Sequence, residues 1–159
     1  KLAKFDFITS TALLLPPHPL QGAVIDHIGI AVKDIEATEA KYKALLGEGC
    51  FHREVVGNQK VEVGFIKVGD IKLELVKALN EESAIHRFIE KRGEGLHHVA
   101  YRVEDIYRVL EILDEAGFRL IDKKPRHGAM NKLVAFIHPK EVDGVLIEVC
   151  QKMKQEDLD

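Results

Sequence analysis

Two histidines and two glutamates carry the strongest chemical signal in this sequence. His27 in the first half of the chain is matched by His98 in the second half. Glu74 is matched in the same way by Glu148, and each of these glutamates stands among apolar strand-forming residues where an unpaired charge would be costly. Imidazole nitrogens and carboxylate oxygens are ligands that divalent metals accept. The doubled pattern therefore predicts a four-ligand metal site to which both halves contribute.

An internal repeat underlies this pairing. Residues 25–35 (IDHIGIAVKDI) are echoed without a gap by residues 96–106 (LHHVAYRVEDI). Each copy begins with the alternation of a strand and changes to the period of a helix, with Asp34 and Asp105 as candidate N-caps. Neither copy has enough apolar residues for a core of its own, so the two are expected to pack as one domain.

Three further strands are predicted after each helix, which makes each copy a βαβββ module. The predicted strands are 51–56, 61–68 and 71–77 in the first module, and 118–122, 133–138 and 145–151 in the second. The fold class is therefore α+β, with tandem βαβββ modules.

The domain is expected to cover residues 24–151, preceded by an N-terminal arm and followed by a short tail. Two prolines in the arm, before His18, exclude a helix at that point. The expected divisions are an arm at 1–23, modules at about 24–79 and 95–151, a linker helix at 83–92, and a tail at 152–159.

Strand alternation predicts which side chains share a face. His27 and Gly29 are expected on one face of the first strand, and His98 and Ala100 on the matching face of its repeat. His97 is expected on the opposite face, toward the helix. His98 rather than His97 is therefore the expected counterpart of His27.

Composition excludes several classes of partner. Lys and Arg number 23 against 26 Asp and Glu, so there is no basic excess for binding nucleic acid. No stretch approaches the roughly 20 apolar residues of a membrane span. Two cysteines, Cys50 and Cys150, are too few for a disulfide framework, and a reducing, cytoplasmic compartment is expected.

A set of short motifs, in order, resembles the methylmalonyl-CoA epimerase family of the vicinal oxygen chelate superfamily. The motifs are DHIGIAV at 26–32, LEL at 73–75, NEES at 80–83, GEGLHHVA at 93–100, KPR at 124–126, HPK at 138–140 and GVLIE at 144–148. The resemblance implies curved sheets around a metal-binding cleft, usually in a homodimer. By position, it puts the metal ligands at His27, Glu74, His98 and Glu148, and Gln is common in the family where Glu74 stands here.

The activity implied by the resemblance is epimerisation of methylmalonyl-CoA, a CoA thioester, at C2. Chelation of the substrate needs two coordination positions beyond the four protein ligands, which favours Co²⁺, Mn²⁺ or Ni²⁺, with Zn²⁺ also able to bind. A two-base mechanism needs a carboxylate on each side of the enolate. Glu148 is the first candidate, Glu74 is the second, and Glu62 is a third. Some members of the family carry a glutamate on the strand after the helix, in the region of Glu62. When this sequence is aligned without a gap, however, Val63 occupies that position, and Glu62 faces the other way.

Three other functions compete with the epimerase. A glyoxalase I-like lactoylglutathione lyase also uses paired His and Glu ligands from two repeats. An extradiol dioxygenase normally has only two His and one carboxylate, so a fourth ligand disfavours it. A non-catalytic small-molecule-binding protein of the same fold commonly lacks the metal ligands.

Overall fold

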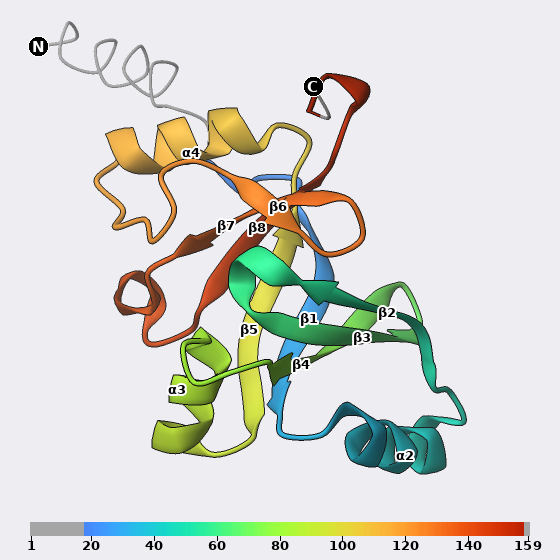
Figure 1. The fold of residues 1–159 in the computed structure, drawn as a ribbon. Coiled ribbons are helices and arrows are strands. Elements are labelled where there is room, and N and C mark those ends of the chain that lie inside the picture. The colour runs from blue at the N-terminus through green and yellow to red at the C-terminus, as the bar shows by residue number, and fades with distance from the viewer. Residues whose placement is uncertain (1–17, 158–159) are drawn as a thin grey trace, which may run out of the picture.

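The computed structural model describes residues 18–157, which form one curved, mixed sheet of eight strands with helices packed on it (Figure 1). The strand order across the sheet is β2-β3-β4-β1-β5-β8-β7-β6. The strands are β1 (Val24–Val32), β2 (Cys50–Val56), β3 (Val61–Val68), β4 (Ile71–Ala78), β5 (Gly95–Arg102), β6 (Arg126–Gly128), β7 (Lys132–Ile137) and β8 (Ile147–Lys152).

Short polar side chains start the helices. Asp34 accepts a hydrogen bond from the backbone of Ala37, and Asp105 does the same at the matching place in the second half, which confirms both predicted N-caps. The α-helices are α2 (Ile35–Leu46), α3 (Ala84–Arg92) and α4 (Ile106–Glu115), and the 3-10 helices are η1 (Gly57–Gln59), η2 (Pro139–Val142) and η3 (Gln155–Asp157). Within residues 18–157, no helix has the length and apolar character needed to cross a membrane.

The repeat in the sequence becomes an approximate twofold relation in the sheet. The first strands of the two modules, β1 and β5, pair antiparallel at the centre, where they lie side by side in Figure 1. Each then pairs in parallel with the last strand of its own module, β1 with β4 and β5 with β8. The predicted α+β fold of tandem βαβββ modules is therefore confirmed, and both halves share one sheet.

Two apolar layers fix the helices against the sheet. Ile106, Val109, Leu110 and Leu113 of α4 are buried against β7 and β8. Around α2, Ile35 is buried with residues of β1, β3 and β4. Because α2 and α4 cover one face of the sheet, the side chains on the opposite face can turn toward a shared cleft, and Ile85 of α3 lies at this cleft.

One predicted strand is wrong. Residues 118–122 form no strand, and only Leu120 makes an isolated bridge, to Ile137. The side chain of Asp122 accepts the backbone N–H of Phe136, which takes a donor that a strand at 118–122 would otherwise use. The short strand β6 pairs with β7 instead and forms the edge of the sheet. Most of the predicted arm, residues 1–17, and the last two residues of the tail lie outside the described residues.

Candidate metal centre and active site

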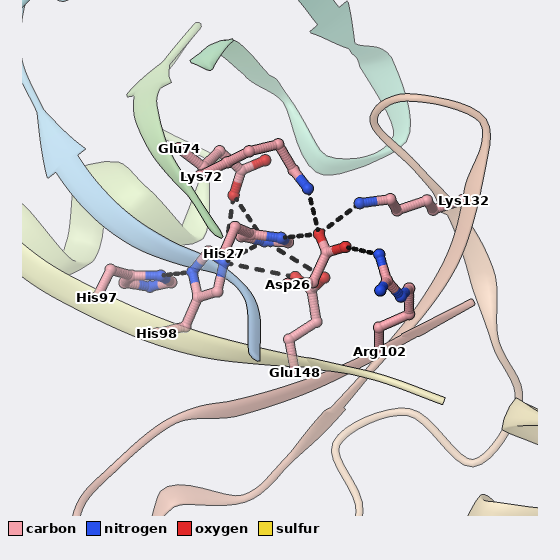
Figure 2. Close-up of polar contacts among 9 residues, drawn as sticks. All are labelled: Asp26, His27, Lys72, Glu74, His97, His98, Arg102, Lys132 and Glu148. Carbon is pink, nitrogen blue, oxygen red and sulfur yellow. Dashed lines mark hydrogen bonds and ion pairs between the residues drawn. The ribbon is translucent and has the colours of Figure 1, made fainter. Parts of the chain in front are cut away.

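Four adjacent central strands bring together the four residues predicted as metal ligands. His27 comes from β1, Glu74 from β4, His98 from β5 and Glu148 from β8. All four side chains are buried, and Figure 2 shows the two imidazoles meeting between the two carboxylates. We call these four residues the quartet. Both modules therefore contribute one histidine and one glutamate to a single cluster.

The donor atoms of the quartet lie at similar distances from one another. The two histidine Nε2 atoms are 3.2 Å apart. Glu74 Oε2 lies 3.4 Å from His27 Nε2 and 3.2 Å from His98 Nε2. Oε1 of Glu148 lies 3.6 Å from His27 Nε2, and its other oxygen, Oε2, lies 3.5 Å from His98 Nε2. Donors bound about 2.0–2.2 Å from one ion stand about 3.0–3.6 Å apart, so the spacing of His27, Glu74 and His98 fits a single divalent cation.

The chemistry of the donors gives a second test of this fit. Two imidazoles and Glu74 form a buried group able to hold a metal ion. Glu148 Oε1 is buried and has no hydrogen-bond partner among the described residues. A buried oxygen of this kind costs free energy unless a cation or a donor meets it. The quartet therefore suits a divalent cation better than a purely structural network.

Small residues on β1 and β5 make room for the cluster. Gly29 pairs with Glu74 across β1 and β4, and Ala100 pairs with Glu148 across β5 and β8. A Cβ atom added to Gly29 would lie 2.0 Å from Cε1 of His98. The His98 ring therefore occupies the space that the missing side chain of Gly29 leaves free.

His97 lies on the same side of the sheet as His98, so its predicted placement on the opposite face is wrong. The register between β1 and β5 shifts after Gly29. Gly29 pairs with His98, but the next residue of β1, Ile30, pairs with Leu96, so His97 is left without a partner in β1. This β-bulge turns the His97 ring toward the cleft, with its Nδ1 atom 2.9 Å from Nδ1 of His98. His98 still matches His27 in the quartet.

Asp26 is a site residue that the sequence interpretation missed. Its Oδ2 atom accepts a hydrogen bond of 2.8 Å from His27 Nδ1, and the residue is buried. Lys132 Nζ lies 2.5 Å and Lys72 Nζ 3.2 Å from the same oxygen, and Arg102 lies 3.5 Å from Oδ1 (Figure 2). The sequence does contain one indication of this role, because Asp26 precedes His27 in the first repeat as His97 precedes His98 in the second.

Burial and neighbouring charges shift the pKa values of these groups. Burial opposes charge on His27, yet hydrogen bonds to Asp26 and Glu74 raise its pKa to about 10. Burial also opposes ionisation of Glu74, but the two histidines lower its pKa below the usual value. Burial raises the pKa of Glu148. The quartet thus strongly favours positive charge at its centre.

Glu62 does not join the cluster. Its carboxylate pairs with Lys77 Nζ at 3.7 Å, and its neighbour Val63 points into the cleft instead. Alternation along β3 puts Val61, Val63 and Phe65 on the cleft side and Glu62 on the other. Glu62 therefore faces away from the cleft, on the face of β3 from which a catalytic base could not reach the quartet.

A cavity of about 310 Å³ opens over the quartet. This volume lies within the range of small-molecule sites, and most of its wall is apolar. Phe65 lies edge-on to His27, and Phe136 lies edge-on to His98. Cationic groups of Lys60, Arg87 and Arg126 also line the cavity. Lys60 pairs with Glu82, and Arg126 pairs with Asp122, so two of these cations already have carboxylate partners beside the apolar wall.

Comparisons with known proteins show the family to which this chain belongs. Residues 26–136 match the Glyoxalase/Bleomycin resistance protein/Dioxygenase superfamily. The chain is 40% identical over 129 residues to the ethylmalonyl-CoA/methylmalonyl-CoA epimerase of Cereibacter sphaeroides, a match that covers 80% of this chain and 96% of that protein. It is 44% identical over 127 residues to the uncharacterized protein YqjC of Bacillus subtilis, covering 80% of this chain and 91% of that one.

A solved structure shows the same likeness in three dimensions. A variant of the Streptomyces coelicolor methylmalonyl-CoA epimerase, in complex with 2-nitronate-propionyl-CoA, superposes with a TM-score of 0.78. It is 36% identical in sequence, and the match covers 81% of this chain and 94% of that one. Fold and sequence similarity therefore extend over nearly all of the described residues.

Proposed function

Because this chain belongs to the glyoxalase/bleomycin resistance protein/dioxygenase superfamily, we propose that it is a metal-dependent epimerase acting at C2 of methylmalonyl-CoA. Relatives named as methylmalonyl-CoA epimerases support the choice of substrate. The observation that carries the proposal is the quartet, in which buried histidines and glutamates from both modules face one centre. The free oxygen of Glu148 gives this centre a group that can accept a proton.

Epimerisation removes the proton from C2 and returns one to the opposite face. A divalent cation held by the quartet, with Co²⁺, Mn²⁺ or Ni²⁺ favoured and Zn²⁺ also able to bind, would supply positive charge against the negative charge that develops on the thioester. The imidazoles of His27 and His98 and the carboxylates of Glu74 and Glu148 would hold this ion. The remaining chemistry is proton transfer, which the protein must perform with its own side chains.

Glu148 is the first base in this proposal, and Glu74 is the second. Glu148 Oε1 is buried and has no hydrogen bond among the described residues, so it can take the C2 proton without first breaking one. Glu74 lies across the histidine pair from Glu148 in Figure 2, and it would act as the second base by leaving the metal. A positioned general acid or base contributes about 10²- to 10⁴-fold to rate.

The walls of the cavity support this chemistry by limiting water. Val63 and Phe65 of β3 and Phe136 of β7 line the space beside the quartet. A low-dielectric wall strengthens every charge interaction at the reacting carbon. The cations at the cavity, including Arg126, suit the carboxylate and phosphates of a CoA thioester.

We further propose that the enzyme is a cytoplasmic homodimer, as the family expectation implies. Both cysteines are free thiols, which suits a reducing compartment. Light scattering coupled to size-exclusion chromatography tests the dimer, and a monomer across the working concentration range would contradict it.

Proton exchange at C2 tests the proposed function. The enzyme is incubated with (2S)-methylmalonyl-CoA in D₂O, with and without EDTA, and the methyl signal is followed by proton NMR. We expect deuterium at C2 and formation of the (2R) epimer, both lost with EDTA and restored by Co²⁺. If the enzyme instead turns over the hemithioacetal of methylglyoxal and glutathione without C2 exchange, it is a glyoxalase-type lyase.

A further inference from the structure

A β-bulge directly precedes each histidine of the quartet. In the pairing of β1 with β5, one register shift between Ile25 and His27 leaves Asp26 as the extra residue of β1. A second shift, between Gly29 and Ile30, leaves His97 as the extra residue of β5. Asp26 and His97 occupy equivalent places in the repeat. The two modules thus share a backbone device that turns the residue before the histidine into the cleft.

Both bulged side chains contact the same atom of the histidine that follows. Asp26 Oδ2 lies 2.8 Å from Nδ1 of His27, and Nδ1 of His97 lies 2.9 Å from Nδ1 of His98. The two rings therefore meet through their other nitrogens, Nε2, which are 3.2 Å apart (Figure 2). Each imidazole is therefore contacted at Nδ1 by the residue before it, while its Nε2 atom faces the centre of the quartet.

We propose that Asp26 and His97 are positioning residues, which fix the ring orientation and the tautomer of His27 and His98 for metal binding. A histidine that binds a metal through Nε2 keeps its proton on Nδ1, and that proton needs an acceptor. Asp26 supplies a carboxylate oxygen to His27, and His97 supplies a ring nitrogen to His98. This inference rests on the proposed metal site.

The role of His97 requires one particular tautomer. Because its Nδ1 atom must accept the hydrogen bond from His98, its own proton must be on Nε2. Phe88 of α3 packs edge-on against the His97 ring with a centroid separation of 4.8 Å, which holds the ring in this orientation. His97 is thus fixed between α3 and the quartet.

The two positioning residues differ in charge, so the two metal ligands are not equivalent. Asp26 is a carboxylate surrounded by the cations of Lys72 and Lys132, whereas His97 is a ring packed against an aromatic side chain. A carboxylate partner makes an imidazole a stronger ligand than a neutral partner does. His27 is therefore the stronger of the two nitrogen ligands.

Calorimetric titration with Co²⁺ alone tests the role of His97. His97→Leu removes the acceptor, and we expect Co²⁺ to bind about 10- to 100-fold more weakly. His97→Asn keeps an acceptor oxygen at the position of Nδ1 and is expected to restore most of the affinity. His86→Leu, which removes a histidine of α3 that pairs with Glu90, is the matched control. Wild-type affinity in folded His97→Leu would overturn the proposal for His97.

Asp26→Asn tests the other positioning residue by the same titration. This variant loses the carboxylate charge, and we expect its loss of Co²⁺ affinity to exceed that of His97→Asn. An affinity equal to wild type would overturn the role of Asp26. If the metal site itself is absent, the wild-type protein shows no saturable Co²⁺ binding, which distinguishes that failure from a failure of the positioning residues.

If the His97 variants do not fold, the role of His97 can still be tested on the wild-type protein. In ¹⁵N-histidine NMR of the Zn²⁺-loaded wild type, His97 is expected to carry its proton on Nε2 and to have an unprotonated Nδ1. A proton on Nδ1 of His97 would show that the ring accepts no hydrogen bond from His98, and this result would overturn its proposed role.

Discussion

A single methyl group added at Gly29 should displace His98 and disrupt the quartet, although no quartet residue is itself substituted. An ideal Cβ there would lie 2.0 Å from Cε1 and 2.2 Å from Nδ1 of His98. Non-bonded carbons are at their best separation at about 3.5–4.0 Å, so the ring must move by about 1.5 Å. A functional group needs placement to within about 0.5 Å, and a misplacement of about 1 Å can cost about 100-fold in rate. Gly29→Ala is therefore expected to slow C2 exchange by about 100-fold or more.

The assay compares Gly29→Ala with Gly57→Ala, because a Cβ added at Gly57 meets no atom within 4 Å. Deuterium incorporation gives the rate, Co²⁺ titration gives the affinity, and urea unfolding gives the stability. Overpacking of this kind costs about 1–3 kcal/mol, less than the stability of a typical domain, so both variants should fold. A folded Gly29→Ala protein with wild-type exchange and Co²⁺ affinity would refute the argument that His98 must stay in place.

Three further predictions use other parts of the molecule. Glu148→Gln should reduce the rate of deuterium incorporation by about 10²- to 10⁴-fold. Glu62→Gln should retain the wild-type rate, because Glu62 pairs with Lys77 outside the cleft. A larger loss of rate in Glu62→Gln than in Glu148→Gln would contradict the assignment. Chelation should lower the melting temperature by about 5–10 °C, since an ion at about 100 times its Kd stabilises by about 2.7 kcal/mol; differential scanning fluorimetry measures this, and an unchanged midpoint would count against the site. Leu113→Ala in the core of α4 should lower the free energy of unfolding by about 2–5 kcal/mol in urea without changing the exchange rate of the folded protein; a slowed rate at unchanged stability would show that Leu113 is not simply a core residue.

Much of the site could be predicted because it depends on strand alternation and on duplication. Alternation groups His27 with Gly29 and His98 with Ala100, and the repeat selects Glu74 and Glu148 as partners. Alternation depends only on neighbouring residues in one strand, and the repeat is visible when the two halves of the chain are compared. Both can therefore be read from a single sequence. The same rule put Glu62 on the outer side of its strand, where the structure has it.

The features that were missed depend on pairing between distant strands. A β-bulge exists only in the register of two strands, so alternation along β5 alone puts His97 on the wrong face. Asp26 was missed for the same reason. No regular strand forms at residues 118–122 because the side chain of Asp122 takes the N–H of Phe136, although the backbone N–H groups of Ile121 and Asp122 still donate to Phe136 O. A side chain that competes with the backbone in this way has no clear pattern in sequence.

The most direct measurement of the proposed activity is the rate of C2 exchange as Co²⁺ is returned to chelator-treated protein. If the quartet is one catalytic metal site, the rate rises in proportion to added Co²⁺ and stops rising at one ion per chain. Exchange that persists after chelation, or a rate that continues to rise well beyond one ion per chain, would contradict a single metal site made by His27, Glu74, His98 and Glu148.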